Sequence, residues 1–231
     1  MCPSDELPDD KRPDFLPAVL GRETQSPAEQ LREATAKLVQ DRLLDGGVVL
    51  SPRSAAEILA LGDKAVEPLV SILIDCRLRD PKGPAAGWAP VHAAQLLGQL
   101  SDVRSVEPLL DVLSTTNQLS PLRVAVEKAL APMGARLIVP ILARLPTAVD
   151  EYRRQLWSLL ANAKVRDKRV FVHLLDALAE SPEQGAMYLA EYGDPAALPE
   201  LSRALDAYQI SLTDDGDHAL FELREAIQEL G

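Results

Sequence analysis

A four-point apolar pattern recurs along this chain and constrains its fold more than any other feature. In residues 91–113, VHAAQLLGQLSDVRSVEPLLDVL, two apolar stripes flank a short polar turn at 101–102. The second stripe has the i, i+3, i+4, i+7 spacing that places four side chains on one face of a helix. Its residues are Val106, Leu109, Leu110 and Leu113. The segment is therefore predicted to form a helix, a tight turn and a second helix.

Copies of this second stripe begin at residues 66, 106, 138, 171 and 198, which are 40, 32, 33 and 27 residues apart; the last copy is degraded. A proline stands two residues after the start in the first three copies, as Pro68, Pro108 and Pro140. His173 takes that place in the fourth copy, and Pro199 comes one residue early in the fifth. Proline is tolerated there because the first turn of a helix has no internal acceptor for its missing N–H.

Each copy is preceded by a predicted partner helix. These first helices are expected at 55–61, 91–100, 122–133, 152–161 and 184–192. We expect them to end at residues that tolerate left-handed backbone, namely Gly62, Gly98, Gly134, Asn162 and Gly193. A single helix pair cannot bury both of its apolar faces, so neighbouring pairs must stack. The sequence therefore predicts an all-α protein, a right-handed α-solenoid of about five helical hairpins.

Helices at both ends are predicted to cap this stack. Ser26-Pro27-Ala28-Glu29 has the residues of a capping box and should open a helix that stops at Gly46-Gly47. A second capping box, Ser54 to Glu57, should open the next helix. The predicted organisation is a disordered or loosely docked tail at 1–25 and one domain at 26–231, with an N-terminal cap at 26–50, repeats at 52–210 and a C-terminal cap helix at 217–230.

Composition narrows the function classes. Hydrophobic residues make up 47% of the chain and aromatic residues only 4%, which indicates a core of Leu, Ala and Val. The formal net charge of −11 disfavours binding to nucleic acid and to anionic lipid. Cys2 and Cys76 lack the spacing of metal ligands and are expected to be free thiols. The acidic start MCPSDELPDD has no apolar run typical of a signal peptide, so we expect a cytoplasmic protein with no membrane span.

Several segments resemble a known repeat family. Residues 62–69, GDKAVEPL, and 104–110, RSVEPLL, resemble the turn and second helix of HEAT-like repeats, including the short bacterial class first noted in phycobilin lyases. Residues 122–125, LRVA, with Ala129-Leu130 are similar to the first helix of that repeat. The resemblance covers roughly residues 52–205 and implies the solenoid fold. It implies little about activity, because such repeats are scaffolds for many functions.

Two enzyme classes within that family can be compared by their motifs. HEAT-like deoxyhypusine hydroxylases hold iron through His-Glu dipeptides. In this sequence none of the three histidines, His92, His173 and His218, is followed by a glutamate. HEAT-like DNA glycosylases use a basic, aromatic-lined cleft, which the net charge and the few aromatic residues disfavour. No phosphate-binding loop or nucleophile motif is present in the sequence. We therefore expect no cofactor and no metal.

Charge is unevenly distributed along the chain. Residues 136–169 hold eight basic residues against three acids, and residues 180–231 hold twelve acids against two bases. The basic band at 136–169 has two interpretations: a docking patch for an acidic partner, or ordinary solvated helix faces with pairing inside the molecule. A second anomaly is the insertion at 76–90, CRLRDPKGPAAGWAP, which lengthens the first repeat spacing. Trp88 in this loop either anchors a partner or covers the core at a helix start.

These observations favour a non-enzymatic interaction scaffold or adaptor that binds a protein or peptide on its solenoid surface. The candidate partner-binding residues are Arg77, Arg79, Trp88, Asp111, Arg144, Arg153, Arg154 and Asp176. Two alternatives stay open at this stage. One is a phycobilin-lyase-like enzyme or enzyme subunit, which the family resemblance suggests. The other is nucleic-acid binding through the basic band at 136–169. The oligomeric state has no signal in the sequence.

Overall fold

The protein is all-helical, as predicted. The computed structural model describes residues 26–117, 119–210 and 217–231, and this part of the chain contains no strand. The predicted tail at 1–25 lies outside the described residues. The helices occur where the apolar patterns place them, in five consecutive pairs between two end helices.

The end helices are α1 (Pro27–Asp45) and α12 (Asp217–Leu230). The pairs between them are α2 (Pro52–Leu59) with α3 (Val66–Ile74), α4 (Ala89–Leu100) with α5 (Val106–Thr115), α6 (Pro121–Leu130) with α7 (Ile138–Arg144), α8 (Asp150–Asn162) with α9 (Lys168–Glu180), and α10 (Pro182–Tyr192) with α11 (Leu198–Ile210). Several connections between helices contain short 3-10 segments, among them Pro84–Gly87, Val103–Ser105 and Ala131–Leu137.

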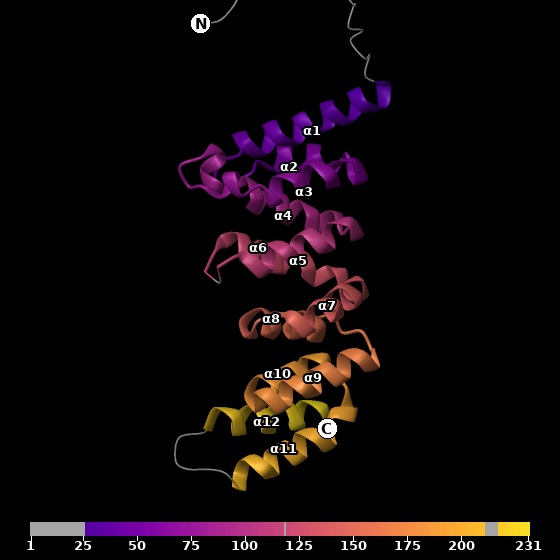
Figure 1. The fold of residues 1–231 in the computed structure, drawn as a ribbon, viewed down its shortest axis with the longest axis vertical. Coiled ribbons are helices and arrows are strands. Elements are labelled where there is room, and N and C mark those ends of the chain that lie inside the picture. The colour runs from indigo at the N-terminus through magenta and orange to yellow at the C-terminus, as the bar shows by residue number, and fades with distance from the viewer. Residues whose placement is uncertain (1–25, 118, 211–216) are drawn as a thin grey trace, which may run out of the picture.

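The helices follow one another along the long axis of the molecule in the order of the sequence, from α1 at one end to α11 and α12 at the other (Figure 1). Contacts join helices that are close in the sequence: α3 packs on α4 and α5, α4 on α6, and α10 on α8, α9 and α12. Buried side chains from Val39 to Ala226 form one continuous hydrophobic core through the stack. Leu, Ala and Val dominate this core, as the composition predicts.

The predicted start of α1 is confirmed. The Glu29 N–H donates to Ser26 Oγ at 3.2 Å, and the Ser26 N–H donates to Glu29 Oε2 at 2.7 Å, which completes the capping box. The predicted capping box from Ser54 to Glu57 is wrong. Ser51 caps α2 instead, because its Oγ accepts from the Ser54 N–H at 3.0 Å. The Glu57 carboxylate pairs with two arginines rather than with the backbone.

The predicted left-handed helix ends are confirmed at three glycines, but the predictions at Gly98 and Asn162 are wrong. Asn162 is the last residue of α8, and Lys164, two residues later, is left-handed with φ 51°. Gly62, Gly134 and Gly193 have φ angles of 57°, 52° and 72°. In α4, however, the helix continues to Leu100 and Ser101 takes the left-handed conformation with φ 49°. Gly98 serves helix packing, because a Cβ there would lie 2.6 Å from Ala129 Cα on α6. The close approach of α4 and α6 explains this glycine, and the local pattern contains no sign of it.

Among the described residues, one run, Pro121–Thr147, is long and apolar enough to be a candidate membrane span. The backbone at Gly134 (φ 52°, ψ −123°) divides this run into α6 and α7, which belong to one helical pair of the stack.

Candidate functional site

The predicted partner-binding residues fall into two groups. Arg77, Arg79 and Trp88 belong to the connection between α3 and α4, which we call the 75–88 loop. Asp111, Arg144, Arg153, Arg154 and Asp176 lie on α5, α7, α8 and α9. The structure joins members of the second group to carboxylates and basic side chains of the protein itself. It places two members of the first group, Arg79 and Trp88, at the edge of one groove.

The 75–88 loop begins with a charged clamp. Asp75 Oδ1 accepts from the Arg77 backbone N–H at 3.0 Å and from Arg77 Nε at 2.9 Å, while Arg77 Nη2 donates to Asp75 Oδ2 at 2.7 Å. These bonds from Arg77 lower the pKa of the Asp75 carboxyl. Arg77 is therefore paired within the loop, and it is not among the side chains that line the groove.

A chain of tight turns folds the rest of the loop. The Gly83 N–H donates to the Asp80 carbonyl at 2.9 Å, and the Trp88 N–H donates to the Ala85 carbonyl at 2.9 Å. Ala85, Ala86 and Gly87 are all left-handed, with φ of 52°, 51° and 81°. Left-handed backbone costs an alanine roughly 1–2 kcal/mol, and such strain is concentrated at functional sites. This loop therefore holds a strained conformation immediately before Trp88.

Gly87 brings the end of the loop back against its beginning. A Cβ at Gly87 would lie 3.0 Å from the Arg79 carbonyl oxygen, so only glycine fits comfortably at this approach. The folded-back loop thereby sets Arg79 and Trp88 on the rim of the same groove.

Trp88 stands at the start of α4, half-buried, and is supported by His92. The two ring centroids are 6.1 Å apart with an interplanar angle of 31°. The His92 ring is buried; its Nε2 lies 3.0 Å from the Gly47 carbonyl oxygen and its Nδ1 3.4 Å from Gln95 Oε1. His92 therefore has a structural role. It links α4 to the connection after α1, and its ring lies beside the ring of Trp88.

The groove has a volume of about 510 Å³ and lies between the 75–88 loop and the connection from α5 to α6. It is lined by Arg79, Pro81, Ala86, Gly87, Trp88, Val91, Thr116, Asn117, Leu119, Ser120, Pro121 and Leu122. Most of these side chains are apolar, and Leu119 is 93% exposed at its rim. Grooves with an apolar lining and few polar groups are typical of ligand and peptide sites.

Arg79 is the one charged side chain among the described residues that line this groove. Its Nη2 lies 3.5 Å from the Leu73 carbonyl oxygen, and its buried Nε has no hydrogen-bond partner. None of the ion pairs found in the described part of the chain includes Arg79, whereas Arg77, two residues away, pairs with Asp75. The groove therefore contains a positive charge that no carboxylate of the described residues neutralises.

Arg123, which the sequence analysis did not select, positions the far wall of the groove. Its side chain is 7% exposed, and its Nη1 donates to the Thr116 carbonyl at 3.0 Å. Its Nε lies 3.1 Å from Glu127 Oε1, and its Nη2 3.8 Å from Glu151 Oε1. This buried cation links α6 and α8 to the end of α5, and so fixes the connection that carries Leu119. A basic residue on an otherwise apolar helical stripe was the only local signal for it.

The second group of predicted residues is engaged inside the protein. Arg144 Nη2 contacts Asp111 Oδ1 at 2.6 Å, and Arg144 also pairs with Glu107. Arg153 Nη2 lies 2.8 Å from Asp150 and 3.0 Å from Glu180. Arg154 pairs with Glu151 at 2.7 Å, and Asp176 lies 3.2 Å from His173 Nδ1. The structure thus brings Asp111 and Arg144 together, while the others have separate partners.

Other cations of the basic band at 136–169 are also paired. Lys164 contacts Glu191 at 3.1 Å, Arg166 contacts Asp194 at 3.3 Å, and Arg169 contacts Asp167 at 2.7 Å. Of the two interpretations of this band, these contacts favour pairing inside the molecule. A direct role of the band in partner binding stays a prediction.

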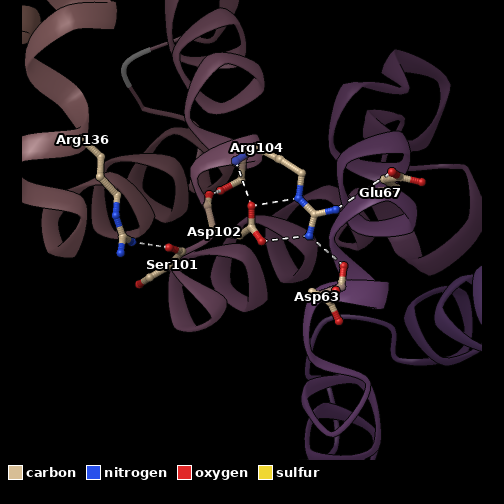
Figure 2. A network of polar contacts seen from close by, with 7 residues as sticks. Asp63, Glu67, Ser101, Asp102, Arg104 and Arg136 are labelled. Carbon is tan, nitrogen blue, oxygen red and sulfur yellow. Dashed lines mark hydrogen bonds and ion pairs between the residues drawn. The ribbon is translucent and has the colours of Figure 1, made fainter.

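A network of arginines joins successive helical pairs, and the sequence analysis missed it. Figure 2 shows Arg104 between Asp102 of its own turn and Asp63 and Glu67 of the preceding pair, with Arg136 of the next pair reaching the Ser101 carbonyl. Arg104 donates from its side chain and its backbone N–H to Asp102, which lowers the pKa of that carboxyl to about 2. The sequence signal for such aspartate–arginine pairs was the Asp-x-Arg motif, which occurs at 75–77, 102–104 and 167–169.

The described residues contain no group of three or more His, Cys, Asp or Glu side chains placed to hold a metal ion. No protein-family model matches the chain, and no curated protein matches it either.

Proposed function

We propose that this protein is a non-enzymatic binding module, a right-handed α-solenoid of about five HEAT-like hairpins that binds a segment of a partner protein in the groove beside Trp88. The order of the helices along the long axis supports the solenoid (Figure 1). So do the contacts between helices that are neighbours in the sequence, and the prolines at equivalent places of three repeats.

One observation carries the functional part of the proposal: a strained, tightly bonded loop presents a half-buried tryptophan to an open apolar groove. Tryptophan is enriched among the residues that dominate binding energy at interfaces. A loop that is already ordered loses little entropy when a partner binds, which favours affinity. The exposed Leu119 on the opposite rim adds apolar surface that a bound segment would cover.

The two alternatives have less support from the geometry. Nucleic-acid binding through 136–169 would use arginines that already share carboxylates with the protein itself. A phycobilin-lyase-like activity rests on the family resemblance, and none of the residues described above calls for a tetrapyrrole. Partner binding in the groove uses a surface that the described residues leave open.

Site-specific photo-crosslinking tests the proposal. A benzophenone amino acid replaces Leu119 in one variant and Val103 in a matched control; both residues are strongly exposed. They flank opposite ends of α5, which are about 15 Å apart for a ten-residue helix. After irradiation in extract of the source cells, we expect a discrete cross-linked protein from position 119 that is absent from position 103 and is lost in Trp88→Ala. Equal products from both positions would contradict a groove-specific partner.

A further inference from the structure

The hydrogen bonding and charge of Arg79 indicate which kind of group the groove binds. A guanidinium carries five N–H donors and stays charged at all physiological pH values. In Arg79 the Nε donor is buried and unpartnered, and Nη2 makes one long contact with a backbone carbonyl. The Nε atom is enclosed by the protein, so an acceptor in the groove would be bound by the terminal Nη nitrogens. These make one long contact among the described residues, and they are therefore left to donate to a group that enters the groove.

The surroundings of Arg79 select the kind of acceptor. The rest of the lining is apolar or carries neutral amide and hydroxyl groups, and no described carboxylate lines the groove. Charge interactions are stronger beside apolar walls than in open water, because the local dielectric constant is lower. A carboxylate placed there would pair with the guanidinium in the two-pronged geometry that arginine favours.

The apolar lining of the groove provides an apolar subsite. Trp88, Val91, Leu122, Pro81 and Pro121 are among the lining residues. A groove of about 510 Å³ has room for a few residues of an extended peptide and is too small for a folded domain. An apolar side chain on Trp88 and an acidic side chain at Arg79 can therefore belong to one short segment.

We infer that the groove recognises an extended peptide segment of another protein that carries an aspartate or glutamate next to an apolar side chain, with Arg79 binding the carboxylate and Trp88 the apolar group. This inference rests on the proposed function. It adds the chemistry of the partner, which exposure of the groove alone does not specify. The unpaired positive charge among apolar walls is the complement of such a segment.

Binding of a defined peptide array tests the inference. The probes are acetylated, amidated heptapeptides in which a central Leu or Phe is flanked, at each position in turn, by Glu, Gln or Lys. Affinities for the best peptides are then measured in solution by fluorescence anisotropy. For the wild-type protein we expect Glu peptides to bind about tenfold more tightly than their Gln counterparts, because a charge-assisted bidentate pair replaces a neutral hydrogen bond.

Variants separate the two subsites. Arg79→Gln should remove the preference for Glu over Gln and keep the preference for a central apolar residue, while Arg79→Lys should restore part of the Glu preference. Lys82→Gln removes one positive charge from the same loop at a residue outside the groove, so it should leave the Glu preference unchanged. Trp88→Ala should weaken all peptides together. Trp88→Phe serves if the alanine variant fails to fold by circular dichroism.

The outcomes distinguish this inference from the proposed function. If Gln or Lys peptides bind the wild-type protein as well as Glu peptides do, and Trp88→Ala still abolishes binding, the groove binds peptides but the role of Arg79 is wrong. If Lys82→Gln removes the Glu preference as fully as Arg79→Gln, a diffuse charge of the loop replaces the specific pair. If no peptide in the array depends on Trp88, the groove itself is rejected.

Discussion

The guanidinium of Arg104 is held against the carboxylate of Asp102 by two hydrogen bonds, from Nε to Oδ1 at 3.0 Å and from Nη2 to Oδ2 at 2.8 Å. Nη2 also donates at 3.0 Å to the carbonyl of Asp63, 41 residues earlier in the chain. A pair that caps one helical turn therefore also joins that turn to the preceding helical pair (Figure 2). The same cation stabilises local structure and the stacking of neighbouring pairs.

This relationship predicts a dependence of stability on acid pH. The pKa of Asp102 is lowered from 3.8 to about 2 by its bonds from Arg104, and Arg169 lowers the pKa of Asp167 to about 2 in the same way. A carboxyl with a lowered pKa in the folded state contributes stability that is present above its unfolded pKa and is lost as pH falls toward its folded pKa. The contribution of both pairs should therefore disappear between about pH 4 and pH 2.

Asp102→Asn isolates the charge, because asparagine still caps a helix. We expect it to lower the free energy of unfolding by about 1 kcal/mol at pH 7 and by nothing measurable near pH 2. Urea unfolding followed by circular dichroism across this range measures the difference. A destabilisation that persists unchanged at low pH would show that Asp102 acts through its shape and its cap alone.

Relief of the strain in the 75–88 loop should increase the stability of the protein and weaken peptide binding. Ala86 is exposed and left-handed, a conformation that glycine adopts without penalty. Ala86→Gly should raise the free energy of unfolding by about 0.5 kcal/mol, since the relieved strain exceeds the extra entropy of the unfolded chain. It should also weaken peptide binding beside Trp88, because the loop becomes less ordered before binding. Matched urea curves and anisotropy titrations measure both effects; tighter binding would refute the role given to loop order.

Arg123 should be far more important to folding than a surface arginine of the same region. Arg123→Met removes a buried cation and leaves the partly buried Thr116 carbonyl without its donor, which should cost about 2–3 kcal/mol. Arg154→Met is the matched control on α8, where the side chain is 41% exposed and pairs with Glu151, and it should cost less than about 1 kcal/mol. Chemical unfolding of both variants tests the contrast. Equal costs would mean that burial of Arg123 adds nothing to its stabilisation.

Gly98 should tolerate no larger residue. The Cβ of Gly98→Ala would meet the backbone of Ala129, which cannot move as a flexible side chain can, so α4 and α6 must separate. We expect a loss of about 1–3 kcal/mol from overpacking. Gln99→Ala, at the exposed next position of α4, is the control and should change stability by less than about 0.5 kcal/mol. Thermal unfolding distinguishes these outcomes; a neutral Gly98→Ala would mean that the two helices can readily separate.

The sequence alone predicted what depends on local spacing. The positions of the helices follow from the periodicity of Leu, Val and Ile, and the capping box at Ser26 and the left-handed glycines at three helix ends follow from residue chemistry over a few positions. It also marked the 76–90 insertion and Trp88 as unusual. These features need only neighbours in the chain, and a sequence displays those neighbours directly.

The tertiary structure decided which distant residues meet. It paired Arg144 on α7 with Asp111, and it left Arg79 of the 75–88 loop without a carboxylate partner among the described residues. It placed Leu119 across a groove from Trp88, buried Arg123 behind Thr116, and made Gly98 a contact with Ala129 rather than a helix end. The physical reason is that pairing, burial and close packing depend on distances between segments, most of them about 30 residues apart in the chain, and the stacking of the helices sets these distances.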